Sequence, residues 1–345
     1  MSTTGHGQIE LATRSLAYAT RGFATMTQGW TGNISRRQFC RAGIAAGTAL
    51  ALANARPANA ADRFPPGQYV DVHTHLGQTW NSTEPLSATQ LLKWMDNNQI
   101  AQAVVLPLVS PESSSFPLTS DFVLAETKPH RDRLIPFCSV DPRTSYRGGT
   151  AGLTDILKRY AEQGAKGFGE HKPGVAIDDR RNMTIYAACG EAKLPVLFHL
   201  DNQRNTDRPG LPGLERVLKE FPQTTFIGHG PGWWASISGG LEQKDLGGYP
   251  DGQVAPGGAI DRLMENYPNI DGDLSAGSGA NSISRDPEFG PQFLIRRADR
   301  LMFGTDFLSP GQEVPQLTLF RTLDLPADVQ AKVFRDNARK LLGLA

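Results

Sequence analysis

The chain has 345 residues, of which 39% are hydrophobic, and it carries 35 basic and 35 acidic side chains. This composition is typical of a globular protein and excludes an intrinsically disordered or collagen-like chain. No stretch is apolar over the roughly 20 residues that a membrane-spanning helix needs.

Residues 1–60 have the features of an export signal. Arg36 and Arg37 precede a short apolar segment of small residues, and the sequence ANA ends at Ala60. A basic region, an apolar region and an A-x-A site make up a secretory signal peptide, and the paired arginines resemble the twin-arginine signal. We therefore expect export by the twin-arginine machinery and cleavage after Ala60. The mature domain, residues 61–345, would then be periplasmic or extracellular.

Removal of this signal changes the charge of the protein. Residues 1–60 contain six Arg and one Glu, so 29 basic and 34 acidic groups remain, a formal net charge of −5. A net negative chain is a poor match for a nucleic-acid surface. The two remaining cysteines, Cys138 and Cys189, are too few for a disulfide scaffold, and we expect them to be buried and free.

The mature chain alternates short apolar runs with longer amphipathic segments, a pattern that indicates repeated βα units. Its 285 residues are close to the ~250 of one (β/α)8 TIM barrel, the fold that we predict. We expect strands at 69–73, 103–108, 134–140, 166–170, 195–199, 224–229, 269–273 and 300–306. We expect helices at 88–99, 153–164, 181–193, 213–221 and 327–344, and a long Gly-rich loop at 231–259.

Histidines stand at the ends of several predicted strands. His73, His199 and His229 end strands one, five and six, and His75 follows two residues after His73. The carboxyl ends of barrel strands form the active-site face, and side chains two residues apart point the same way. Because imidazole suits zinc and similar transition metals, the pattern predicts a metal site at this rim.

Two carboxylates are candidate partners for these histidines. Asp306 ends strand eight, where a buried carboxylate needs a cation or several donors; the alternative is a helix cap. Glu170 ends strand four and is a candidate ligand; the alternative is an ion pair with Lys166 or Lys172.

The ordered set of motifs resembles metal-dependent hydrolases of the amidohydrolase superfamily, in its amidohydrolase-related branch. These motifs are DVHTHLG, the FH that ends strand five, IGHG, FGTDF and the terminal FRDNARKLLGL, and the resemblance covers residues 68–345. It implies that His73, His75 and Asp306 bind one metal ion. It also implies that His199 and His229 bind a second ion or assist the first.

The resemblance leaves the strand-four ligand open. Many members bridge two metals with a carboxylated lysine, whereas others use a glutamate. The sequence GFGE is similar to the glutamate type, which favours Glu170; if Lys166 were the bridge, Glu170 would only support it. We expect one or two divalent ions, with zinc preferred.

The resemblance implies an enzyme that hydrolyses an ester, lactone or amide bond of a small molecule. Asp306, as general base, and His229 are the expected catalytic residues, and Arg143 and Trp233 are candidate substrate contacts. The alternative is a metal-dependent non-oxidative decarboxylase on the same barrel. A non-catalytic binding protein is disfavoured because all the expected ligands are present. A homo-oligomer is compatible with the sequence.

Overall fold

The structure, a computed structural model, describes residues 68–79, 82–144 and 147–344. The predicted export signal lies outside these residues. Within the described residues, eight strands follow one another, each pairing in parallel with its neighbour within two groups. The strands are β1 (Tyr69–Thr74), β2 (Ile100–Val105), β3 (Leu134–Pro136), β4 (Phe168–His171), β5 (Val196–His199), β6 (Phe226–His229), β7 (Ile270–Asp273) and β8 (Leu301–Met302).

The strands form two arcs that join at two seams. One arc has the order β1-β2-β3 and the other β4-β5-β6-β7-β8. At the first seam, Cys138 N–H donates to Gly167 O and Gly169 N–H donates to Cys138 O, both at 2.9 Å. At the second, Val72 N–H donates to Phe303 O at 3.0 Å. The two arcs therefore close into a single barrel, and the predicted fold is confirmed.

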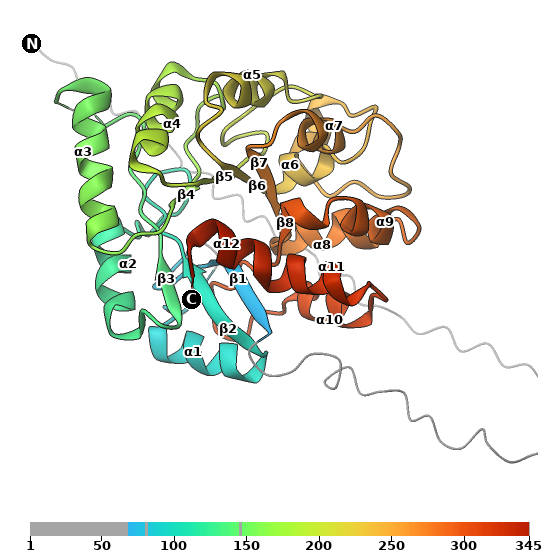
Figure 1. Cartoon of the computed structure of the whole chain (residues 1–345), viewed down its shortest axis with the longest axis horizontal. Coiled ribbons are helices and arrows are strands. Elements are labelled where there is room, and N and C mark those ends of the chain that lie inside the picture. The colour runs from blue at the N-terminus through green and yellow to red at the C-terminus, as the bar shows by residue number, and fades with distance from the viewer. Residues whose placement is uncertain (1–67, 80–81, 145–146, 345) are drawn as a thin grey trace, which may run out of the picture. The chain divides into compact units, whose positions relative to one another are not determined.

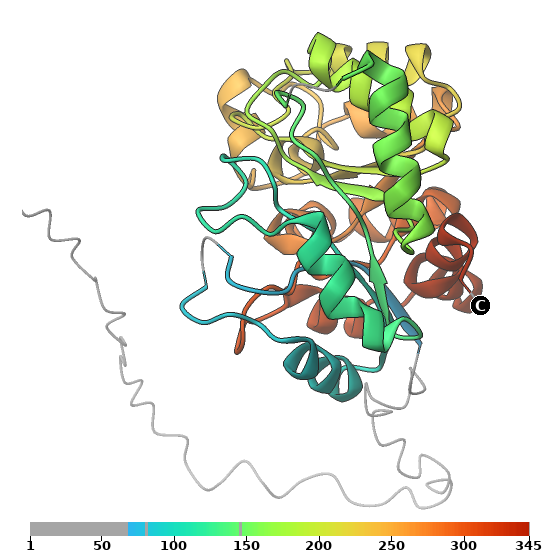
Figure 2. The same cartoon turned by 90° about the vertical axis from the view of Figure 1, so that its left-hand side faces the viewer.

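Helices surround the strands in chain order (Figure 1) and cover the outside of the barrel, as the turned view also shows (Figure 2). The helices are α1 (Ala88–Asn97), α2 (Ser120–Thr127), α3 (Gly149–Glu162), α4 (Arg180–Ala192), α5 (Pro212–Glu220), α6 (Pro231–Ala235), α7 (Ala259–Asn266), α8 (Ala276–Ser284), α9 (Phe289–Arg296), α10 (Pro315–Thr322), α11 (Ala327–Ala331) and α12 (Asn337–Leu342). The first four predicted helices occur within a few residues of their expected bounds. The last is divided by a π-helical turn, Lys332–Asp336.

The segment 231–259 is not the open loop that its glycines suggest. It begins with α6, in which Trp233 and Trp234 are both buried, and it contains a 3-10 turn, Gln243–Gly247. The Trp233 ring packs against Gly228 of β6, where a Cβ atom would come within 2.4 Å of it. Apolar anchoring therefore holds this segment on the barrel, which glycine content alone does not reveal.

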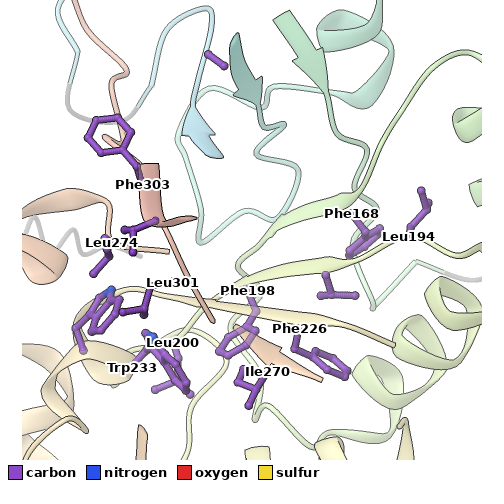
Figure 3. Close-up of a cluster of buried hydrophobic side chains, with 14 of the residues drawn as sticks. Phe168, Leu194, Phe198, Leu200, Phe226, Trp233, Ile270, Leu274, Leu301 and Phe303 are labelled. Atoms are coloured by element: carbon purple, nitrogen blue, oxygen red, sulfur yellow. The ribbon is translucent and has the colours of Figure 1, made fainter. Parts of the chain in front are cut away.

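Two hydrophobic clusters pack on the strands. The larger one lies between strands and helices, and Figure 3 shows Phe198, Phe226 and Trp233 together in it. The smaller one joins side chains of several strands to Ala338 and Leu342 of α12. Cys138 and Cys189 are buried and free, as predicted. Within the described residues, no helix is both long and apolar enough to cross a membrane.

Candidate metal centre

Side chains from three strand ends converge on one point of the barrel rim. His73 Nε2 and His75 Nε2 lie 3.2 Å apart, and Asp306 Oδ1 lies 3.6 Å and 3.5 Å from them. Glu170 Oε2 lies 3.9 Å from His73 Nε2 and 3.6 Å from His75 Nε2. Three potential ligand atoms, from the end of β1 and from the end of the β8 segment, thus face a common centre, and Glu170 Oε2 lies beside the two histidines.

Hydrogen bonds on the far side of three imidazoles fix how these rings face the centre. His73 Nδ1 lies 2.7 Å from Asp273 Oδ2, and His75 Nδ1 lies 2.9 Å from the carbonyl oxygen of Leu106. Both partners are acceptors only, so each Nδ1 carries a proton and each Nε2 is turned toward the centre. A histidine that binds a metal through Nε2 is held in this orientation.

His229 is oriented in a related way, through a hydroxyl group. Its Nδ1 lies 2.8 Å from Ser275 Oγ, and that hydroxyl donates to Asp273 Oδ2 at 2.7 Å. Because the Ser275 proton is used on Asp273, Ser275 Oγ accepts from His229 Nδ1–H. His229 Nε2 is then free to act as a ligand, and it lies 3.7 Å from Glu170 Oε1.

His199 differs from the other three histidines. Its Nδ1 lies 2.9 Å from Glu170 Oε1, and its Nε2 lies 2.9 Å from Asp201 Oδ2. Asp201 is held in turn by Arg204, whose Nη2 is 2.6 Å from Asp201 Oδ2. Both ring nitrogens of His199 therefore face carboxylate oxygens, and neither offers a free lone pair to a metal ion.

Glu170 is central to the cluster and is almost fully buried. Burial opposes its ionisation, but the Lys172 ammonium and the hydrogen bond to His199 hold the pKa of Glu170 well below its ordinary value. The adjacent Gly169 has a φ of +142°, and a Cβ atom there would lie 2.4 Å from the carbonyl oxygen of Leu197. Only glycine fits at this position, so Gly169 lets β4 lie against β5 and present Glu170 at the rim.

Asp306 reaches the centre from an unusual backbone conformation. Its φ is +57°, in the left-handed region that non-glycine residues seldom adopt. Its N–H donates to His73 O at 2.8 Å, which fixes this conformation at the β8–β1 seam. Burial raises the pKa of the Asp306 carboxyl, but His73 and His75 outweigh that effect, and the pKa is lowered. Asp306 is thus presented as a carboxylate.

Asp273, at the end of β7, is a site residue that sequence reasoning missed. Its carboxylate contacts His73 and His229, and Ser275 donates to it. Although burial raises its pKa, the two histidines outweigh burial and hold the pKa of Asp273 below its ordinary value. The signal was available, because Asp273 ends the predicted strand 269–273 just as the histidines end theirs.

A cavity of about 320 Å³ opens beside the cluster. The candidate ligands His75, Glu170, His199, His229 and Asp306 line it, together with Lys172 and Arg204. The first residues of α8 and Tyr249 line it as well. A cavity of this size accommodates a small molecule.

Both predicted substrate contacts lie away from the cavity, and so does the lysine that was the alternative strand-four ligand. Arg143 forms ion pairs with Glu112 at 2.5 Å and with Asp141 at 2.7 Å, and Trp233 is fully buried in the core. Lys166 is exposed at the start of the β4 segment. None of the three lines the cavity. Substrate contact by Arg143 or Trp233 stays a prediction that this placement does not favour.

The centre formed by His73, His75 and Asp306 has the spacing that a divalent cation needs. Ligand atoms about 2.1 Å from a tetrahedral ion lie roughly 3.4 Å from one another, and the separations among these three atoms are 3.2–3.6 Å. Glu170 Oε2, 3.6–3.9 Å from the two histidines, is the candidate fourth ligand. Two imidazole nitrogens and two carboxylate oxygens suit zinc and related metals. A second candidate group, formed by Glu170, His199 and His229, is also present.

Comparison with known protein families gives one match over most of the chain. The family model described as amidohydrolase matches residues 70–344. Among proteins with curated functions, no sequence matches the chain.

Solved structures resemble the chain in fold. An uncharacterised TIM-barrel protein from Bordetella bronchiseptica is 17% identical with a TM-score of 0.57, covering 80% of this chain and 98% of its own. A "probable 2-pyrone-4,6-dicarboxylic acid hydrolase" from Acinetobacter baumannii is 13% identical with a TM-score of 0.52, covering 80% and 99%. The 5-carboxyvanillate decarboxylase of Sphingomonas paucimobilis is 13% identical with a TM-score of 0.51, covering 81% and 100%.

Proposed function

Since the chain belongs to the amidohydrolase family, we propose that it is a metal-dependent hydrolase of a small carboxylate-bearing ester or lactone. The observation that carries this proposal is the convergence of His73 Nε2, His75 Nε2 and Asp306 Oδ1 beside the cavity. The family and the fold make the chain an enzyme, and the reaction and the substrate are the parts that we propose.

The ion would be held by His73, His75 and Asp306, with Glu170 Oε2 as a fourth ligand. His229 Nε2 lies 3.7 Å from Oε1, the other oxygen of Glu170. When bound, a divalent cation polarises the scissile carbonyl and lowers the pKa of water to about 7. We propose that Asp306 acts on the proton of the attacking water; its lining of the cavity and the 21% exposure of its side chain support this role. Its carboxylate would accept that proton and pass it to the leaving group.

The other residues of the cluster orient these groups and exclude water. Asp273 and Ser275 hold His73 and His229 in one tautomer, so the rings need no rearrangement when substrate enters. We propose that His229, which lines the cavity, contacts the oxygen of the scissile group as charge develops on it.

The carboxylate preference rests on the part of the cavity wall that α8 forms. The N-terminus of α8 lies at the cavity, where the first N–H groups of a helix are unpaired within the helix and favour an anion. Ser278, which lines the cavity there, is 2% exposed and its hydroxyl has no hydrogen-bond partner. Lys172 and Arg204 are paired with Glu170 and Asp201, whereas the buried Ser278 hydroxyl of α8 has no such partner.

A substrate panel tests the reaction. The full chain, loaded with Zn²⁺ or Mn²⁺, is assayed with 2-pyrone-4,6-dicarboxylate, with unsubstituted 2-pyrone and with 5-carboxyvanillate. We expect chelator-sensitive ring opening of the dicarboxylate, detected as loss of pyrone absorbance without release of carbon dioxide. No turnover of any lactone or ester, in protein that has bound metal, would contradict the hydrolase proposal.

Decarboxylation is the second candidate. It is favoured by the same α8 wall, because a substrate carboxylate held there or at the metal is also what a decarboxylase requires. A solved structure of similar fold is named as a decarboxylase of a carboxylated aromatic ring. Release of carbon dioxide from 5-carboxyvanillate, with no lactone opening, would select this reaction over hydrolysis.

The Ser278→Ala variant tests the binding wall. A hydrogen bond to a charged group contributes about 1.5 kcal/mol, so KM for a carboxylated substrate is expected to rise about tenfold. KM for its neutral analogue should stay the same, because that molecule brings no anion to α8. Ser284→Ala, at the other end of the same helix, is the matched control. Equal changes in KM for both substrates would mean that Ser278 acts only through packing.

A further inference from the structure

Lys172 occupies a position that the mechanism above does not use. Its ammonium nitrogen lies 3.1 Å from Glu170 Oε1 and 3.4 Å from Glu170 Oε2, and only 8% of the residue is exposed. A lysine buried to this degree is rare unless it is paired. The ammonium group thus stands at the carboxylate that two metal ions would have to share.

The three-residue group Glu170, His199 and His229 has the composition of a second metal site, but its atoms are already engaged. Glu170 Oε1 contacts both the Lys172 ammonium and His199 Nδ1. The remaining nitrogen of His199 contacts Asp201. An ion bound at Glu170 Oε1 would displace the His199 hydrogen bond and lie close to a fixed positive charge.

We propose that Lys172 takes the place of a second metal ion and limits the enzyme to one divalent cation per chain. The cation is held by His73, His75, Asp306 and Glu170, and the Lys172 ammonium neutralises the other side of the Glu170 carboxylate. This inference rests on the proposed function only in that a divalent cation binds at the rim.

Metal content tests the proposal without any assay of activity. The full chain is saturated with Zn²⁺, freed of excess ion by gel filtration, and measured by mass spectrometry against protein concentration. We expect one ion per chain in the wild type and two in Lys172→Met, because removal of the ammonium frees Glu170 Oε1. Lys172→Arg keeps the charge and should stay at one. Lys166→Met, which removes an exposed lysine near the same strand, should also stay at one.

The outcomes separate this inference from the proposed function. Two ions in the wild type, or one ion in a folded Lys172→Met protein, overturn the role of Lys172 and leave the hydrolase proposal standing. Absence of metal from the wild type overturns both. Circular dichroism establishes whether Lys172→Met folds; if it does not, Lys172→Gln is measured in its place, and the wild-type count tests the proposal in either case.

Discussion

Replacement of Asp306 by asparagine is expected to lower kcat about a thousandfold, the scale of a lost general base. Asparagine tolerates the left-handed φ of +57° at this position, so the backbone should keep its conformation. What is lost is a carboxylate oxygen 3.5–3.6 Å from two histidine nitrogens, and with it the proton acceptor. The measurement is kcat for the best substrate of the panel, together with metal content.

Metal content decides between the two roles of Asp306. If Asp306→Asn retains its ion and loses turnover, the carboxylate acts on the proton; if it loses the ion as well, ligation is the larger part of its role. Asp324→Asn, on the exposed surface after α10, is the matched control and should keep full activity. Turnover near the wild-type rate with metal retained would show that the base has been assigned wrongly.

Asp273→Asn is expected to weaken metal affinity by about 10- to 100-fold, the usual effect of losing a carboxylate that orients a histidine ligand. Asp273 accepts from His73 Nδ1–H and from Ser275, and it lies 3.3 Å from His229 Nδ1. All three contacts are made to Oδ2, and the Ser275 N–H donates to Oδ1 at 3.0 Å. An amide has one oxygen, so either the Oδ2 contacts or the bond from Ser275 N–H is lost. Competition with a chromogenic chelator gives the dissociation constant.

The same strand provides the control for this variant. Asp271, two residues earlier in β7, pairs with Arg300 and does not line the cavity. Asp271→Asn should therefore leave metal affinity unchanged, although it removes the same charge from the same strand. Equal loss of metal affinity in both variants would mean that the negative charge of β7 as a whole determines metal affinity, and not the contact of Asp273 with His73.

The sequence predicted those parts of the molecule whose signal is local. Most of the strands contain a short apolar run, although β7 (IDGD) does not, and His73, His199 and His229 lie at or next to strand ends, so their positions in the sequence indicate the rim. β8 shows the limit of this reasoning. It is only two residues long, because Phe303 and the residues that follow continue toward β1 through separate hydrogen bonds.

The parts that were missed depend on tertiary contacts. Helix α8, with the sequence AGSGANSIS, has no apolar stripe that periodicity could detect, and its position comes from packing on α6 and α10. The role of Lys172 was equally hidden. The sequence offered it as an ion-pair partner of Glu170, but only the structure shows that it shares the carboxylate with His199 and lines the cavity.

The two-arc construction of the barrel has a consequence for its stability. His73 and His75 belong to the arc β1-β2-β3, whereas Glu170 belongs to the arc β4-β5-β6-β7-β8. An ion held by residues of both arcs is a cross-link between them, in addition to the backbone hydrogen bonds that close the seams. Because the ion binds only the folded protein, its binding adds to the free energy of unfolding. The melting temperature of this enzyme should therefore rise with metal concentration, and removal of the ion by a chelator should destabilise the barrel at its two seams.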